Sequence, residues 1–152
     1  MRTFTSIDDI CAAVGDELGT SEWIQITQDR VDRFADATGD HQWIHVDVER
    51  ATAESPFGGP IAHGYLTLSL VPMLGWQIFE IKGSKMGINY GSNKVRFINP
   101  VTVGSRLRLR AKLLSAEALQ DGSLQMIVGQ TMEIEGRDKP ALVAETVSRV
   151  AF

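Results

Sequence analysis

The sequence predicts an α+β fold in which a curved antiparallel sheet wraps around one buried helix. The first half of the chain has helical and irregular patterns, whereas the second half has consecutive strand patterns. The stretch from Ile61 to about Phe79 is apolar on almost every side, which is typical of a buried helix rather than an amphipathic one. Several strands have a single apolar face. A sheet that encloses the helix buries both the helix and those faces.

The N-terminal part is expected to hold a short helix and a short strand. Ser6 has the character of a helix N-cap, with an acidic residue, Asp9, three positions later. We expect this helix to extend to about Val14 or Leu18. Residues 23–26 then alternate as a short strand does.

A second helix is predicted between Thr27 and Gly39. Thr27 is a suitable N-cap, apolar residues follow at helical spacing, and Gly39 is a natural C-terminal stop. Residues 40–60 fit neither periodicity, and their last five positions are rich in Pro and Gly, which indicates a loop. Pro72 is expected to kink the central helix or to end it early.

From Lys85 onward the apolar residues alternate with a period of two. The clearest strand covers residues 106–113, where Arg and Lys alternate with Leu and Ala. Asp121–Gly122 is a hairpin turn signal, and the alternation resumes over 124–134 and 141–151. Short connections favour antiparallel pairing. The Arg and Lys side chains of the strand over 106–113 either face solvent or bind phosphate groups of a ligand.

Length and composition fit a single domain over residues 1–152. A formal net charge of -4 gives no general attraction to nucleic acid or to an anionic membrane surface. The N-terminus lacks the apolar core of a signal peptide, and no apolar run is long enough to span a bilayer. Cys11, the one cysteine, cannot form an internal disulfide. We therefore expect a cytoplasmic protein.

The richest candidate site runs from Gly39 to Asp47. Asp40 and His45 are five residues apart, so they point apart on a helix and face opposite sides of a straight strand. They converge only if the chain turns between them. A converging carboxylate and imidazole can orient one water and transfer its proton near neutral pH. In the alternative, Asp40 caps a helix and His45 is a satisfied polar residue.

A metal site at the same place is a weaker interpretation. His41 and His45 have the spacing of a helical zinc pair, but Gln42 stands where the glutamate of that motif belongs. Asp47 or His63 could complete the ligand set. Because the set matches no specific template, we predict no metal.

His63 and Gly64 form a second candidate site at the start of the apolar helix. The first N–H groups of a helix have no partner within it and carry the positive end of its dipole. The Gly64 N–H could therefore hold a carbonyl oxygen that gains negative charge. Glycine also lets a ligand approach the backbone closely. Alternatively, Gly64 serves only tight packing.

These residues resemble a known family. The segment from Phe34 to His45 resembles the signature of MaoC-like R-specific enoyl-CoA hydratases, and Pro60-Ile61-Ala62-His63-Gly64 resembles their Pro-x-x-His-Gly motif. The stretch from Asn89 to Val101 resembles their next strand. The segment Asp-His-Gln-Trp-Ile-His at residues 40–45 is similar to the corresponding segment in the branch of nodulation-protein-N-like and actinobacterial hydratases.

The resemblance implies a hotdog fold and a hydro-lyase that acts on acyl-CoA in lipid metabolism. It implies that Asp40 and His45 activate a water that adds to a trans-2-enoyl thioester, giving an R-3-hydroxyacyl thioester, while the Gly64 N–H polarises the thioester carbonyl. Gln42 and His63 are expected to support this site. No cofactor is implied, and the expected assembly is a homodimer with one shared sheet.

Three other functions share the fold or the substrate. A hotdog thioesterase usually has its carboxylate on or near the central helix, where this sequence has none. A 3-hydroxyacyl-carrier-protein dehydratase differs only in the carrier, which the sequence does not distinguish. A non-catalytic acyl-thioester-binding subunit would not need Asp40 and His45. The family motif has Asn-Pro where this chain has Gln42-Trp43, a departure that bears on substrate shape.

Overall fold

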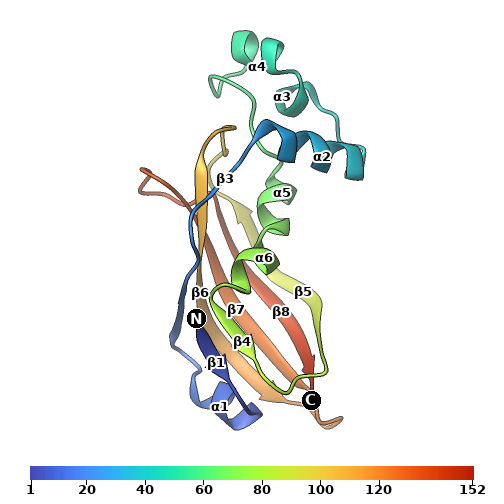
Figure 1. Cartoon of the computed structure of the whole chain (residues 1–152), viewed down its shortest axis with the longest axis vertical. Coiled ribbons are helices and arrows are strands. Elements are labelled where there is room, and N and C mark those ends of the chain that lie inside the picture. Colours follow the sequence, from blue (N-terminus) through green and yellow to red (C-terminus); the bar gives the residue numbers. More distant parts are fainter.

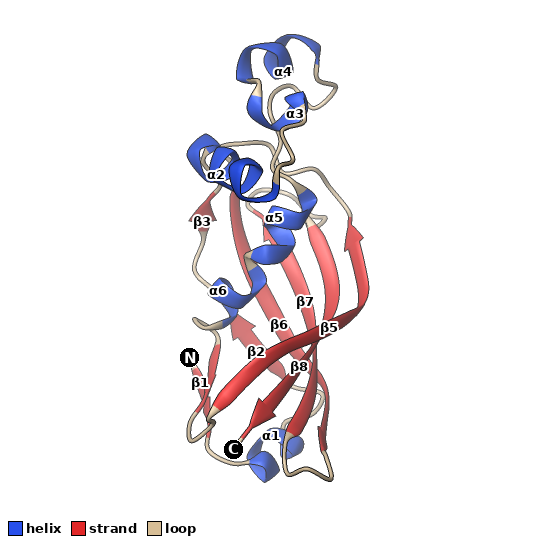
Figure 2. Cartoon of the chain, turned by 90° about the vertical axis from the view of Figure 1, so that its right-hand side faces the viewer, coloured by secondary structure: helices blue, strands red, loops and turns tan.

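The curved antiparallel sheet is present, with the central helical segment on its concave face (Figures 1 and 2). The computed structural model describes residues 1–152. The elements in chain order are β1 (Arg2–Phe4), α1 (Ile7–Ala12), β2 (Glu17–Thr20), β3 (Ile24–Gln25), α2 (Gln28–Thr38), α3 (Trp43–Val46), α4 (Val48–Glu54), α5 (Gly64–Ser69), α6 (Val71–Gly75), β4 (Phe79–Ile81), β5 (Met86–Phe97), β6 (Arg106–Ala118), β7 (Leu124–Ile134) and β8 (Leu142–Ala151).

The main sheet has the strand order β2-β6-β7-β8-β5, and β3 also pairs with β6. All of its pairings are antiparallel, as the short connections predicted. The alternation in β6 and β7 places one face of each strand in the core and the other outside. The small parallel pair of β1 with β4 was not predicted, because three-residue strands at distant positions leave no periodic signal.

The ends of α2 agree with the sequence. The Thr27 side chain accepts a hydrogen bond from the Arg30 N–H, and Gly39 closes the helix in the left-handed conformation with φ 80°. Ser6 caps α1 as expected, by accepting from the Asp9 N–H. However, α1 ends at Ala12, short of the predicted Val14 or Leu18.

The predicted helix over 61–79 was wrong in its extent. It begins at Gly64, breaks at Leu70 and ends at Gly75. The residues before Gly64 are extended because they pair with a loop: the Ala62 N–H donates to the Val101 carbonyl at 2.8 Å. Pro72 lies in the first turn of α6, where its missing N–H costs no helical bond.

The hydrophobic core lies between the concave face of the sheet and α5 and α6. Leu66, Leu70 and Leu74 from the helical segment join a cluster with the inward side chains of β6, β7 and β8. Leu107, Leu109 and Leu113 of β6 belong to the same cluster and are fully buried. This packing determines where the N-terminus of α5 lies relative to the sheet.

At one end of the molecule, α2, α3 and α4 form a group beyond the sheet, next to the start of α5 (Figure 1). The sequence predicted a loop over 40–60, and the two short helices α3 and α4 were missed there. Strand β5 ends the sheet order and has no strand on its outer side. None of the helices is both long and apolar enough to cross a membrane.

Candidate active site

The turn that follows Gly39 brings Asp40 and His45 together. Gly39 reverses the chain at the end of α2, and α3 begins four residues later at Trp43. The ligand atoms of Asp40, His45 and His63 lie within 4.8 Å of one another. Asp40 is exposed, whereas His45 is 7% and His63 3% exposed. A solvent-facing carboxylate therefore lies beside two buried imidazoles.

The tautomer of neutral His45 follows from its hydrogen bond. Its Nδ1 lies 2.6 Å from the Ile61 carbonyl oxygen. A carbonyl only accepts, so Nδ1 carries the proton and donates it. The lone pair is then on Nε2, which is free to accept a proton from a water. The Ile61 N–H in turn donates to the Ile44 carbonyl at 3.0 Å, so the residues before α5 hold α3 in place.

Burial lowers the pKa of His45 below its ordinary value of 6.5. The desolvation of the charged ring is the largest cause, and His63 acts in the same direction. The bond to Ile61 and the charge of Asp40 oppose it less strongly. The imidazole is therefore neutral at pH 7, the state in which Nε2 can act as a base.

His63 packs directly on this pair. Its ring stacks on His45 with 3.9 Å between centroids and 26° between planes, and Phe34 covers it at 5.0 Å. His63 Nε2 donates to the Asp40 carbonyl at 2.9 Å and lies 4.0 Å from Asp40 Oδ2. The carbonyl bond assigns the proton to Nε2 and leaves Nδ1 without a partner.

Gly64 is the first residue of α5, and its N–H makes no hydrogen bond within the chain. It directly follows His63, so this amide lies next to the Asp40, His45 and His63 cluster. A Cβ on Gly64 would lie 3.0 Å from ring atoms of Phe97. This approach is tighter than nearly all Cβ contacts, so a larger residue at this position would push the Phe97 ring by a few tenths of an ångström.

Asp40, His45 and His63 are also the side chains that could hold a metal ion. The other histidine, His41, lies outside this group and pairs with Asp36 at 2.9 Å. Asp47 caps α4 by accepting from the Arg50 N–H. The helical zinc pair therefore does not form.

Of the two supporting residues predicted, the structure brings only His63 into the cluster. Gln42 contributes backbone groups: its carbonyl accepts from the His45 N–H, and its N–H lies 3.4 Å from Asp40 Oδ1. The sequence did not point to Gln28, whose side chain reaches the His45 carbonyl at 2.8 Å. As the first residue of α2 it carries no local signal of such a contact.

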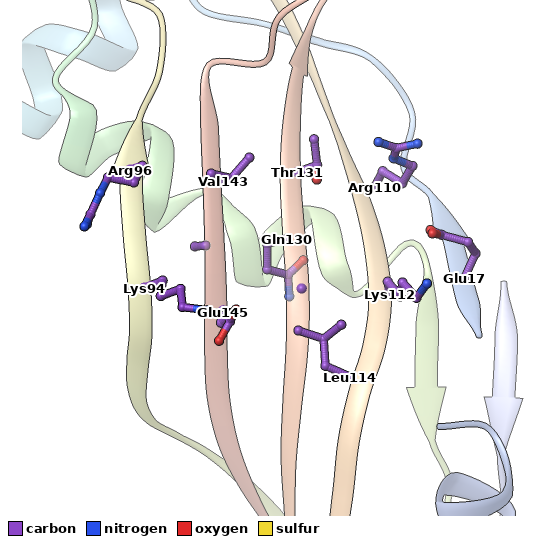
Figure 3. A pocket seen from close by; sticks show the side chains of 12 residues that line it. Glu17, Lys94, Arg96, Arg110, Lys112, Leu114, Gln130, Thr131, Val143 and Glu145 are labelled. Carbon is purple, nitrogen blue, oxygen red and sulfur yellow. Dashed lines mark hydrogen bonds and ion pairs between the residues drawn. The ribbon is translucent and has the colours of Figure 1, made fainter. Parts of the chain in front are cut away.

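A groove of about 360 Å³ lies elsewhere, on the outer face of the sheet (Figure 3). Cations from β5 and β6 line it, but Figure 3 shows them pointing in different directions. Lys94 pairs with Glu145 at 2.9 Å, and Arg110 lies 3.6 Å from Glu133. The cations are partly neutralised and do not converge on one point, so this groove does not form an anion site.

Comparisons with known proteins identify the family. The chain matches the MaoC like domain over residues 9–134. It is 56% identical over 149 residues to the 3-hydroxyacyl-thioester dehydratase Z of Mycobacterium tuberculosis (strain ATCC 25618 / H37Rv), covering 98% of each chain. It is 47% identical over 148 residues to nodulation protein N of Rhizobium meliloti (strain 1021), covering 97% of this chain and 92% of that protein. The chain belongs to the MaoC-like domain family.

Solved structures agree with the fold. The monoamine oxidase regulatory protein from Archaeoglobus superposes with a TM-score of 0.80 at 24% identity, covering 98% of this chain and 95% of that chain. The (R)-hydratase from A. caviae superposes with a TM-score of 0.69 at 25% identity, covering 89% and 94%. The predicted hotdog fold is confirmed.

Proposed function

We propose that this protein is an R-specific hydro-lyase that adds water to trans-2-enoyl-CoA, giving R-3-hydroxyacyl-CoA, and that it also catalyses the reverse dehydration. One observation carries the proposal: a carboxylate, an imidazole with a free Nε2 and an unpaired helix N–H lie together at the start of α5. These groups supply the base, the proton source and the oxyanion donor that the reaction needs.

The reaction begins with one water held between the Asp40 carboxylate and His45 Nε2. The pair accepts a proton from the water as its oxygen bonds to C3 of the enoyl group. Electrons move toward the thioester oxygen, and the Gly64 N–H donates a hydrogen bond to the charge that develops there. A proton then passes from the pair to C2, so one water is added in total. Because the same pair performs both transfers, addition is syn.

The relatives support the chemistry and leave its preferred direction open. One is named for dehydration of a 3-hydroxyacyl thioester, and one structural neighbour is named an (R)-hydratase. The two names describe opposite directions of one equilibrium. An acyl carrier protein in place of CoA would present the same thioester to these residues.

The thioesterase alternative would place a carboxylate on the central helical segment. Neither α5 nor α6 contains Asp or Glu. The residues support hydration more directly, since Asp40 and His45 lie beside the Gly64 amide. A non-catalytic acyl-thioester-binding subunit would gain nothing from a neutral imidazole poised next to a carboxylate.

A homodimer fits the exposed edge of the sheet. Strand β5 is 12 residues long, nearly all of it exposed, and open along one side. Such an edge favours pairing with another strand. Pairing with β5 of a second copy would join two sheets into one. Light scattering during size exclusion would give twice the chain mass if this is right. We expect the cytoplasm as the location, with Cys11 as a free thiol.

Ultraviolet absorbance of the conjugated thioester tests the proposed activity, with crotonyl-CoA as substrate. Wild-type protein should remove the absorbance, and Asp40→Asn and His45→Gln should each lower the rate by about 10²–10⁴-fold. His41→Gln is the matched control, because His41 lies at the surface outside the cluster. Release of free thiol would indicate a thioesterase instead. Binding of crotonyl-CoA without either signal would indicate the non-catalytic subunit.

A further inference from the structure

Gln28 makes hydrogen bonds that the proposed reaction does not use and that reach the site. Its Nε2 donates to the His45 carbonyl at 2.8 Å and to Asp32 Oδ1 at 2.7 Å. The two acceptors lie on different elements: His45 on α3, and Asp32 one turn further along α2. One side-chain amide therefore ties α2 to the backbone of the residue that carries the reactive imidazole.

The orientation of this amide is determined by its acceptors. A carbonyl and a carboxylate accept hydrogen bonds, so both require the NH₂ group of Gln28. A flipped amide would place Oε1 against two oxygens. In the observed orientation Oε1 is buried and has no partner.

The geometry around His45 indicates what the amide does. The ring is held at Nδ1 by the Ile61 carbonyl, and its face is covered by His63. These contacts orient the ring only if the backbone of α3 keeps its place. That helix has four residues and no side-chain cap at its N-terminus, so it has little stability of its own. The Gln28 hydrogen bond reaches α3 at His45, the residue whose ring must be oriented.

We propose that Gln28 is a positioning residue for the His45 imidazole, and that Asp32 orients Gln28. This inference rests on the proposed function. Without the amide, α3 shifts relative to the Asp40 carboxylate and the Gly64 N–H. The water then meets the imidazole at a less favourable distance, while the thioester still binds. A small displacement of a reacting group slows chemistry much more than it weakens binding.

The test compares Gln28→Met with Gln25→Met in the full-length protein. Methionine has a similar length and shape but donates no hydrogen bond. Gln25 lies on the surface and makes one long bond, 3.4 Å to the Gly104 carbonyl. With crotonyl-CoA, Gln28→Met should lower kcat by about tenfold or more with KM nearly unchanged. Gln25→Met should match the wild type. Equal kcat in the two variants would overturn the proposal, and so would a loss confined to KM.

Asp32→Ala is a second test that does not depend on the folding of Gln28→Met. Asp32 is partly exposed, and its loss frees the Gln28 amide to rotate. We expect a smaller drop in kcat than in Gln28→Met, with KM nearly unchanged, and a wild-type kcat in Asp32→Ala would overturn the proposal. Where Gln28→Met folds, adding Asp32→Ala to it should cause no further drop, and additive losses would mean that the two residues act separately.

Imidazole ¹⁵N spectra give a readout that needs no activity. The Nδ1–H signal of His45 should shift or broaden in Gln28→Met and stay in place in Gln25→Met. An unchanged signal in both would refute the positioning role. If the wild type hydrated no enoyl thioester while the His45 signal still shifted, the proposed function would fail and the positioning role would stand.

Discussion

Adding one methyl group at Gly64 tests the placement of the oxyanion donor. In Gly64→Ala the new Cβ would lie 3.0 Å from Cγ and Cδ1 and 3.1 Å from Cδ2 of Phe97. The ring must move by a few tenths of an ångström. Phe97 is 46% exposed, so it has room to move. The methyl group and the displaced ring both crowd the Gly64 N–H, to which the thioester oxygen must bind.

Gly64→Ala should change the free energy of unfolding little and lower kcat strongly. Alanine is favoured over glycine in a helix by roughly 0.5–1 kcal/mol, which offsets the cost of moving Phe97. The free energy of unfolding should therefore change by less than about 1 kcal/mol. Removing one oxyanion donor lowers kcat by about 10²–10³-fold, so a crowded donor should cost up to about 10²-fold.

Gly75→Ala is the matched control. Gly75 also lies in the central helical segment, and a Cβ there would meet no atom within 4 Å. Crotonyl-CoA hydration and thermal unfolding are measured for both variants. Gly75→Ala should keep full activity. If Gly64→Ala were as active as Gly75→Ala, the Gly64 amide would not be the oxyanion donor.

Three other predictions follow from the site and the core. First, kcat/KM should fall as pH drops through an inflection below 6.5, because the lowered pKa keeps His45 neutral down to that point. An inflection above 6.5 would contradict the burial argument. His45 binds a proton more readily in the unfolded chain than in the folded one. Its contribution to stability is therefore complete above pH 6.5 and is lost as pH falls toward the lowered pKa, which denaturant titrations across this range would detect. Second, exhaustive dialysis against a chelator should leave the hydration rate unchanged, and a loss restored by added zinc would mean that Asp40, His45 and His63 do hold a metal. Third, Leu109→Ala should lower the free energy of unfolding by about 2–5 kcal/mol, because Leu109 is fully buried, with kcat little changed in the folded fraction; a smaller loss by urea titration would mean that the core collapses around the cavity.

Much of the fold was predictable because its signals are local. In β6 and β7 a period of two places apolar side chains on one face, and that pattern needs no knowledge of the rest of the chain. The bounds of α2 follow from Thr27 and Gly39 in the same way. The helix α3 was missed because its four residues are held by a distant segment, through the bond from the Ile61 N–H to the Ile44 carbonyl. The helix α4 was missed although its signal is local, since Asp47 caps it by accepting from the Arg50 N–H.

By itself, the sequence determined the residue types of the site and their order: an acid, a histidine and a glycine at the start of an apolar helix. Only the tertiary structure decided how these groups meet. The proton positions on His45 and His63 depend on the carbonyls of Ile61 and Asp40, and the role inferred for Gln28 depends on a contact between α2 and α3. Such contacts join residues 16–23 positions apart, where neither periodicity nor propensity carries information.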